Sequence, residues 1–216
     1  MTPYKLSFLE LALEACALEF GEFNLKSGRK SPYFFNASAF STGRQLSILG
    51  QCYRDAIEAS GVNFDGLYGP AYKGIPLATS VAHAFAAKGR DVPVSFNRKE
   101  SKEHGEGGKL LGSSLSGSIL AIDDVVTAGT ALRESADFIR DHGACLRAFC
   151  VAVDRQERGQ TGTHSALSEL SETLDLEPIS IICLDDILSF ASKDSRISRA
   201  IVLSIEDYRH KYGADF

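Results

Sequence analysis

Hydrophobic positions in the first quarter of the chain follow a helical period in two places. Apolar residues recur every three to four positions over residues 6–20 and again over 46–57, which is typical of amphipathic helices. Thr42 and Gln45 have the spacing of a capping box, and Gly61 is a typical helix end. The second helix is therefore predicted to begin just after Thr42 and to end at Gly61.

From residue 65 onward, short apolar strands alternate with helical segments. Residues 23–40 break the helical period and are rich in Phe, Tyr, Gly and Ser, so we expect short strands and turns there. Farther on we expect strands at 65–68, 92–96, 118–124, 145–154 and 179–184, a long polar loop up to about 112, and helices at 75–87, 131–142, 164–174 and 187–212. Strands separated by helices predict a parallel sheet covered on both faces, which is an α/β fold.

The overall composition excludes several classes of protein. The chain has 216 residues, of which 44% are hydrophobic and 24% charged, with a formal net charge of -5; this fits one globular domain. An acidic chain lacks the basic face that nucleic acids require. No apolar stretch reaches the ~18 residues of a membrane span, and the N-terminus lacks a signal-peptide pattern. We therefore expect a cytoplasmic protein without nucleic-acid or membrane partners.

The most informative segment is residues 118–130 (SILAIDDVVTAGT). A nearly continuous apolar strand ends in Asp123 and Asp124, and a turn of small residues opens the next helix, at the rim where open α/β sheets bind ligands. The turn 127–130 can wrap a phosphate, because Gly129 permits close approach and the first helix amides lack partners. Since the carboxylates would repel that phosphate, we assign them to the vicinal hydroxyls of a ribose 5-phosphate, directly or through a metal. The alternative is a strand end with solvated acids.

This segment resembles the phosphoribosyl pyrophosphate (PRPP) signature of type I phosphoribosyltransferases. Four further segments are similar in order and spacing to the orotate phosphoribosyltransferase family: 20–36 (FGEFNLKSGRKSPYFFN), 69–76 (GPAYKGIP), 97–108 (NRKESKEHGEGG) and 154–159 (DRQERG). The resemblance implies the type I phosphoribosyltransferase fold, with a central, mostly parallel sheet flanked by helices. It implies a single domain over 1–216, with a small hood subdomain and N-terminal helix at about 1–40 and a mobile catalytic loop at about 97–112.

The resemblance also implies an activity and a homodimer. The enzyme, a pentosyltransferase, would transfer the 5-phosphoribosyl group from PRPP to orotate, giving orotidine 5′-monophosphate and pyrophosphate in pyrimidine (UMP) biosynthesis. Mg²⁺ is the expected cofactor, held mainly by PRPP, with Asp123 or Asp124 as possible ligands. Lys99 and its loop would reach across the dimer interface into the neighbouring subunit's site.

Residues for PRPP and for catalysis follow from the matching motifs. The amides of 69–74 and the Lys73 ammonium can meet an anion at the sheet rim, and the resemblance implies that this anion is pyrophosphate; a plain turn with a solvated lysine is the alternative. The resemblance assigns catalysis to Lys102, His104, Asp123 and Asp124. It assigns PRPP binding to Tyr72, Lys73, Arg98, Lys99, Lys102, His104, Asp123, Asp124, Val125, Val126, Thr127, Ala128, Gly129, Thr130 and Ala131.

The base site is expected to involve Lys26, Phe34, Phe35, Thr127 and Arg155, which the resemblance places on orotate. Aromatic walls suit the face of a pyrimidine, and cations suit its carboxylate. A packed aromatic pair and a surface salt bridge are the alternatives.

Two other functions stay open at this point. A phosphoribosyltransferase for an uncharged base would not require Lys26 and Arg155. A PRPP-sensing regulator that binds RNA or DNA would need a basic face and a degraded loop at 98–108, whereas the chain is acidic and this loop is intact.

Overall fold

The computed structural model describes the chain except residues 26, 103–107, 127–128, 160–163 and 215–216. Its strands are β1 (Leu18–Asn24), β2 (Lys30–Phe35), β3 (Gly66–Gly69), β4 (Val94–Lys102), β5 (Gly108–Gly112), β6 (Ser118–Asp123), β7 (Cys145–Asp154) and β8 (Glu177–Cys183). Its α-helices are α1 (Pro3–Glu14), α2 (Gly43–Ser60), α3 (Gly74–Ala86), α4 (Thr130–Asp141), α5 (Ala166–Leu174), α6 (Leu184–Ala191) and α7 (Arg199–Tyr212), and a 3-10 turn covers Ala37–Ala39.

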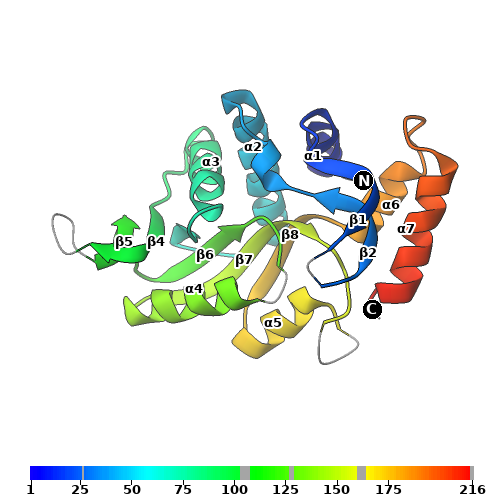
Figure 1. Cartoon of the computed structure of the whole chain (residues 1–216). Coiled ribbons are helices and arrows are strands. Elements are labelled where there is room, and N and C mark those ends of the chain that lie inside the picture. Colours follow the sequence, from blue (N-terminus) through cyan, green and yellow to red (C-terminus); the bar gives the residue numbers. More distant parts are fainter. Residues whose placement is uncertain (26, 103–107, 127–128, 160–163, 215–216) are drawn as a thin grey trace.

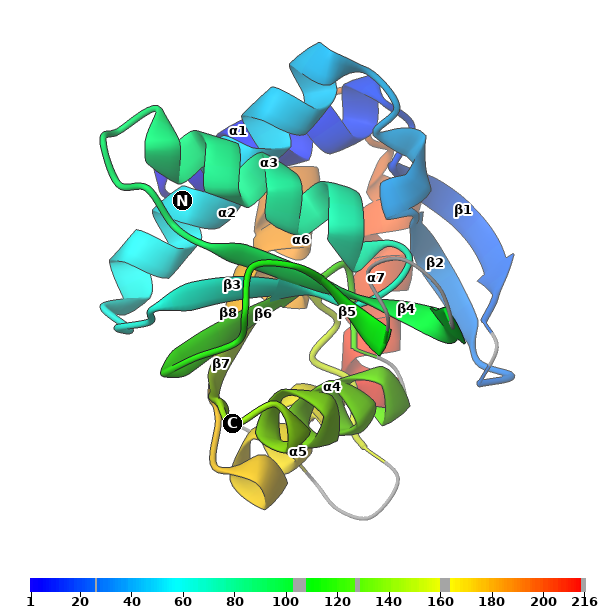
Figure 2. The ribbon, with the colours of Figure 1, turned by 90° about the vertical axis from the view of Figure 1, so that its left-hand side faces the viewer.

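A six-stranded sheet in the order β5-β4-β3-β6-β7-β8 forms the centre of the described chain (Figure 1). Strands β4, β3, β6, β7 and β8 are parallel, and β5 runs antiparallel to β4 at one edge. Helices α1, α2 and α3 lie over one face, and α4 and α5 over the other (Figure 2). This arrangement confirms the predicted α/β class with a mostly parallel sheet.

The central strands have nearly continuous apolar sequences because both of their faces are buried. In β7, six consecutive residues from Ala148 to Val153 are buried, because helices cover both faces of a parallel sheet.

The second helix of the chain, α2, also forms as predicted. The Thr42 hydroxyl accepts from the Gln45 amide at 3.3 Å, the Gln45 side chain accepts from the Thr42 amide at 3.1 Å, and Gly61 ends the helix at φ 73°.

Three predicted elements differ in the structure. The N-terminal helix ends at Glu14 instead of continuing to 20, because Cys16 takes a φ of 53° and the chain turns into β1. The C-terminal segment 187–212 is not one helix, since α6 and α7 are separate and the Ser198 hydroxyl caps α7 by accepting from the Ile201 amide at 3.4 Å.

The third difference concerns the polar loop expected at 97–112. Much of this range is strand, because β4 continues to Lys102 and β5 begins at Gly108. The two strands pair antiparallel, with Asn97 opposite Leu110 and Lys102 opposite Gly108. Backbone pairing at the edge of a sheet satisfies amides and carbonyls while leaving room for polar side chains. Polarity alone therefore does not exclude a strand there.

The N-terminal region packs into the main core. Strands β1 and β2 form a separate two-stranded antiparallel sheet beside α7 (Figure 1). Phe8 from α1 and Tyr33 from β2 are fully buried in the same hydrophobic cluster as Leu49 of α2 and Ile181 of β8. The hairpin is therefore fixed against the core and lies beside the last turns of α7.

Candidate active site

The loops after β3 and β6 lie next to each other at the carboxyl edge of the sheet. Strand β3 lies between β4 and β6. From β3 the chain passes through α3 outward to β4, whereas from β6 it passes through α4 in the opposite direction to β7. In open α/β sheets, ligands bind at the point where the connections diverge in this way. The loop at 70–73 and residues 124–126 flank that point.

The acidic pair at the end of β6 is held in place by backbone and side-chain hydrogen bonds. Asp124 is only 6% exposed, and its Oδ2 pairs with Lys73 Nζ at 2.7 Å. Its Oδ1 accepts from the Val125 amide at 3.0 Å. Asp123 Oδ1 accepts from the Asp124 amide at 2.8 Å, and the buried Tyr53 hydroxyl donates to the Asp123 carbonyl at 2.7 Å. Nothing in the sequence indicated that Tyr53 would hold the end of β6 in this way.

The electrostatics of the pair favour a cationic or hydrogen-bond-donating ligand. Burial, together with the adjacent Asp124 carboxylate, raises the pKa of Asp123 to about 7. A cation or a donor hydroxyl beside Asp123 would favour its ionised form. Within the described residues, no group of three or more His, Cys, Asp or Glu side chains is placed to hold a metal ion.

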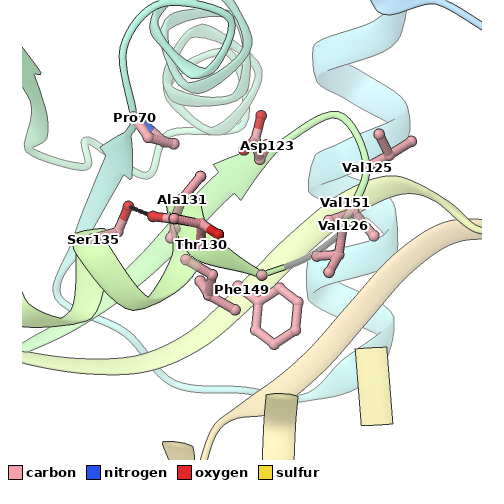
Figure 3. Close-up of a pocket in the computed structure, with 12 residues that line it drawn as sticks. Pro70, Asp123, Val125, Val126, Thr130, Ala131, Ser135, Phe149 and Val151 are labelled. Atoms are coloured by element: carbon pink, nitrogen blue, oxygen red, sulfur yellow. Dashed lines mark hydrogen bonds between the residues drawn. The ribbon is translucent and has the colours of Figure 1, made fainter. Parts of the chain in front are cut away.

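A cavity of about 240 Å³ opens beside Asp123 and the first turn of α4 (Figure 3). Its walls include Pro70, Val125, Val126, Thr130 and Ala131. Across the described residues, no side chain caps the N-terminus of α4. The first amides of an uncapped helix are a site for an anion, since they lack partners and carry the positive end of the helix dipole.

Gly129 is required where this helix begins. It takes a φ of 71°, a conformation that side chains disfavour, and a Cβ there would lie 2.4 Å from Leu170 Cδ1. Any larger residue would therefore strain the turn and push the Leu170 side chain out of its position.

The loop after β3 brings Lys73 beside Asp124 and Tyr72 beside β4. The peptide bond between Ala71 and Tyr72 is cis, and the Ala71 amide donates to Asn97 Oδ1 at 2.8 Å. Tyr72 is 65% exposed, and Lys99 Nζ lies 5.1 Å from the centre of its ring. Arg98 is half-buried on β4. Lys73 is thus not a simple solvated lysine, because it pairs with the buried Asp124 carboxylate, and its role toward pyrophosphate stays a prediction.

The two phenylalanines predicted for the base point to opposite faces of β2. Phe34 is exposed and stacks on Phe23 with ring centres 5.5 Å apart. Phe35 is 8% exposed and packs between Phe8 and Phe40 in the core, at 5.9 and 6.3 Å. Successive side chains of a strand alternate between faces, so the two rings cannot line one pocket. The Phe35 ring therefore belongs to the core and the Phe34 ring is exposed, and the prediction that both residues contact the base stays a prediction.

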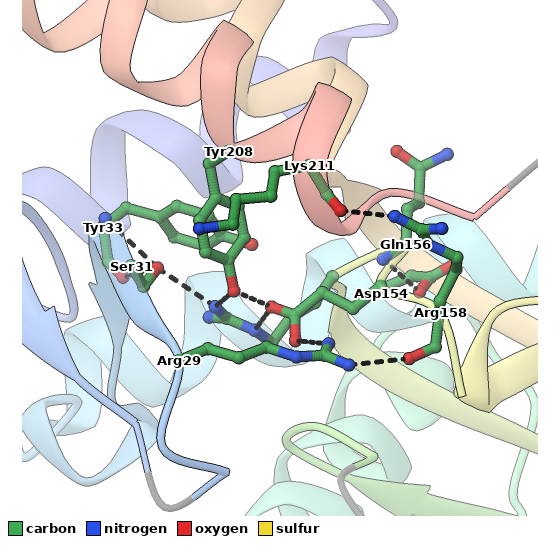
Figure 4. Close-up of polar contacts among 10 residues, drawn as sticks. Arg29, Ser31, Tyr33, Asp154, Gln156, Arg158, Tyr208 and Lys211 are labelled. Atoms are coloured by element: carbon green, nitrogen blue, oxygen red, sulfur yellow. Dashed lines mark hydrogen bonds and ion pairs between the residues drawn. The ribbon is translucent and has the colours of Figure 1, made fainter. Parts of the chain in front are cut away.

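Arg155 lies just past β7 in a largely buried polar cluster, of which Figure 4 labels Ser31, Tyr33 and Tyr208. Its side chain is 14% exposed, and its Nε donates to Glu157 Oε1 at 2.6 Å. Its Nη2 donates to Ser31 Oγ at 3.1 Å, and its guanidinium lies 4.5 Å from the centre of the Tyr33 ring. Burial alone would lower the pKa of Arg155, but Tyr33 and Glu157 raise it. The alternative of a surface salt bridge is wrong, since the ion pair is largely buried.

Four of the predicted site residues lie outside the described part of the chain: Lys26, His104, Thr127 and Ala128. For Lys102, the structure describes only the backbone. Of the other predicted residues, Lys73 lies beside Asp124 and Lys99 beside Tyr72. Arg155 contacts Ser31 and Tyr33 on one face of β2, whereas Phe34 lies on the other face.

Comparison of the sequence with known protein families and relatives agrees with this geometry. The family described as "Phosphoribosyl transferase domain" matches residues 47–168, more than half of the chain, so the fold and site define a phosphoribosyltransferase of type I. Orotate phosphoribosyltransferase of Cronobacter sakazakii is 50% identical over 214 residues, covering 99% of this chain and 100% of the relative, and that of Salmonella newport is 49% identical with the same coverage. The chain belongs to the orotate phosphoribosyltransferase family, as predicted, and is thereby a pentosyltransferase.

A solved structure supports the same assignment. The crystal structure of orotate phosphoribosyltransferase from Francisella tularensis superposes with a TM-score of 0.86 at 37% identity, over 96% of this chain and 99% of that one. In the described part of the chain, no helix has the length and apolarity to cross a bilayer.

Proposed function

We propose that the chain transfers the 5-phosphoribosyl group of PRPP to N1 of orotate, which gives orotidine 5′-monophosphate and pyrophosphate. The observation that carries this proposal is the acidic pair beside an uncapped helix start at the divergence point of the sheet. One end of that arrangement suits a phosphate and the other suits a diol. These are the two ends of a ribose 5-phosphate.

PRPP would lie with its 5′-phosphate at the N-terminus of α4. The turn from Val125 to Ala131, which includes Val126, Thr127, Ala128, Gly129 and Thr130, would surround that phosphate with backbone amides. The ribose hydroxyls would donate to Asp123 and Asp124. A neutral hydroxyl that donates to a buried carboxylate stabilises its charge, which offsets the burial that raises the pKa of Asp123.

Pyrophosphate would bind over the loop after β3. Lys73 now pairs with Asp124, and its Nζ is on a side chain that is 54% exposed, so it has room to turn toward an incoming anion. That exchange would free Asp124 Oδ2 for a ribose hydroxyl. Tyr72, Arg98 and Lys99 would complete the pyrophosphate site with Lys102 and His104.

Mg²⁺ fits the same place. Few carboxylates are needed for Mg²⁺ when substrate phosphates complete its octahedron, and Asp123 and Asp124 are the two that would hold it. When bound, Mg²⁺ would supply positive charge that stabilises the departing pyrophosphate.

The chain's own residues would act mainly by electrostatics. As the bond from C1 of the ribose to pyrophosphate breaks, negative charge grows on the leaving group, where Lys73, Arg98, Lys99 and Lys102 would meet it. His104 would steady the pyrophosphate. The segment at 97–112 would act as a mobile lid that excludes water from the electron-poor sugar.

Orotate would lie between β2 and the start of the loop after β7. Phe34 offers an exposed aromatic face, and Lys26, Thr127 and Arg155 would supply donors for the carboxylate and ring carbonyls.

The chain would act in the cytoplasm as a single domain, in which residues 1–40 form the hood over the base. It would work as a homodimer in which Lys99 serves the neighbouring subunit's site. Mixing Lys99→Ala subunits with Asp124→Asn subunits tests this, since shared sites restore part of the activity and unshared sites restore none.

Pyrophosphate release with PRPP, Mg²⁺ and a panel of bases tests the reaction itself. We expect release with orotate and none with uracil or hypoxanthine. Release with uracil or hypoxanthine but not with orotate would overturn the proposal.

A further inference from the structure

The C-terminal helix α7 reaches Arg155 through the hydroxyl of Tyr208, both directly and through the carboxylate of Glu157; Figure 4 shows Tyr208 in this cluster. We infer that Glu157 and Tyr208 are positioning residues for base recognition: they fix the Arg155 guanidinium so that one nitrogen faces the base. This inference rests on the proposed role of Arg155 in binding orotate. It gives α7 a function in the reaction, although no residue of α7 is expected to touch a substrate.

Both oxygens of Glu157 are engaged. Its Oε1 accepts from Arg155 Nε at 2.6 Å and from the Tyr208 hydroxyl at 2.7 Å, and its Oε2 accepts from Arg29 Nη1 at 2.9 Å. The Glu157 side chain is 14% exposed. A largely buried carboxylate with three donors has one preferred position, because any rotation breaks a charge-assisted hydrogen bond. Glu157 therefore joins α7, the hairpin and Arg155 in a fixed geometry.

The last turn of α7 is tied to the same loop by the backbone. The Arg158 amide donates to the Tyr212 carbonyl at 2.9 Å, and the Ala214 amide donates to the Gln156 carbonyl at 2.9 Å. The Arg158 side chain also donates to the Lys211 carbonyl. These bonds hold the Tyr208 side of the helix at a constant distance from Arg155, so the Tyr208 hydroxyl is a fixed support.

The contacts of Arg155 leave one nitrogen available. Nε is taken by Glu157, and Nη2 donates to Ser31 Oγ at 3.1 Å and to the Tyr208 hydroxyl at 3.4 Å. Nη1 has no hydrogen-bond partner in the described part of the chain and is not among its buried unpartnered atoms. The guanidinium also lies over the buried Tyr33 ring. Arg155 therefore has a single nitrogen, Nη1, left to donate to the base, because its other two nitrogens are engaged.

Replacing Tyr208 by Phe removes one hydroxyl and keeps the ring that packs on Tyr33 and Tyr212. We expect the KM for orotate to rise about five- to tenfold, because the hydrogen bonds that the hydroxyl makes with Glu157 and with Arg155 Nη2 are both lost. The KM for PRPP should stay within about twofold, since the PRPP residues lie on other strands. Tyr212→Phe is the matched control: it makes the same change on the same helix, at a hydroxyl without a hydrogen bond among the described residues, and should leave both KM values unchanged.

Combining substitutions separates positioning from general damage. Arg155→Lys should raise the KM for orotate, and adding Tyr208→Phe to it should raise that KM no further, because the residue that Tyr208 positions is already gone. Glu157→Gln, which keeps an acceptor but loses the charge, should resemble Tyr208→Phe. Thermal melts of every variant check that each is folded at the assay temperature.

The outcomes distinguish the two claims. If Arg155→Lys raises the KM for orotate but Tyr208→Phe and Glu157→Gln do not, the positioning inference is overturned and the proposed base site stands. Additive effects in the double variant would overturn it too. If Arg155→Lys leaves the KM for orotate unchanged, Arg155 does not bind the base, and both the base site and the inference fall.

Discussion

Lys73 and Lys88 provide a matched pair for testing how much a lysine stabilises a buried carboxylate compared with an exposed one. Each lysine is about half exposed, at 54% and 50%, and each reaches a carboxylate at short range, 2.7 Å to Asp124 and 2.9 Å to Glu58. The partners differ, since the Asp124 side chain is 8% exposed and that of Glu58 is 43% exposed. Removing each lysine therefore isolates the effect of leaving a buried carboxylate without its cation.

The structure sets the size of the two effects. A buried acceptor left without its partner costs about 1–3 kcal/mol, and more when charged. Because water reaches Lys73 and screens part of the interaction, we expect Lys73→Ala to lower the free energy of unfolding by about 1–2 kcal/mol. An exposed pair contributes about 0–1 kcal/mol, so Lys88→Ala should cost less than about 0.5 kcal/mol. Lys73→Ala should also lower kcat about 100-fold, as one donor to the leaving group is lost.

Urea unfolding at pH 8 and steady-state kinetics measure both effects. Adding Asp124→Asn to Lys73→Ala should restore most of the lost stability, because Asn keeps an acceptor for the Val125 amide without a buried charge. It should not restore activity. If Lys73→Ala is no more destabilising than Lys88→Ala, or if the double variant is the less stable one, the argument about the buried carboxylate is wrong.

Three further predictions concern other parts of the molecule. Gly129→Ala should weaken PRPP binding at least tenfold, because its φ is 71° and its new Cβ meets a side chain at 2.4 Å; Gly143→Ala, also at positive φ but with no atom within 4 Å, is the control, and equal affinities in the two variants would contradict the expectation. Burial raises the pKa of Asp123 from 3.8 to about 7, so the folded state binds the proton more tightly than the unfolded state, and the free energy of unfolding should fall from about pH 4 to pH 7. Asp123→Asn should flatten that fall in urea melts, and an unchanged slope would argue against the shift. Phe35→Ala should cost about 3–5 kcal/mol of stability, whereas Phe34→Ala should mainly raise the KM for orotate; the reverse pattern would show that the two faces of β2 are assigned wrongly.

The parts of the fold and site that sequence predicted depend on local patterns. The segment around Asp123 could be identified because its apolar strand, paired acids and glycine turn are contiguous, and the parallel sheet followed from the alternation of strands and helices. The capping box at Thr42 is likewise local and formed as predicted.

The parts that sequence missed depend on contacts between distant residues. Tyr208 and Glu157 are 51 positions apart, and nothing in either segment indicates that they meet. Phe34 and Phe35 look equivalent as neighbours, and only the packing of α1 against one face of β2 separates their roles. The extension of β4 to Lys102 depends on its pairing with β5, which polarity did not reveal.

The most direct measurement is a crystal structure of the protein soaked with ribose 5-phosphate. We predict the phosphate at the first amides of α4 and the two adjacent sugar hydroxyls within hydrogen-bond distance of Asp123 and Asp124, with Lys73 turned away from Asp124. Electron density for the sugar elsewhere, or phosphate density without any approach of the hydroxyls to either carboxylate, would contradict the assignment of this site.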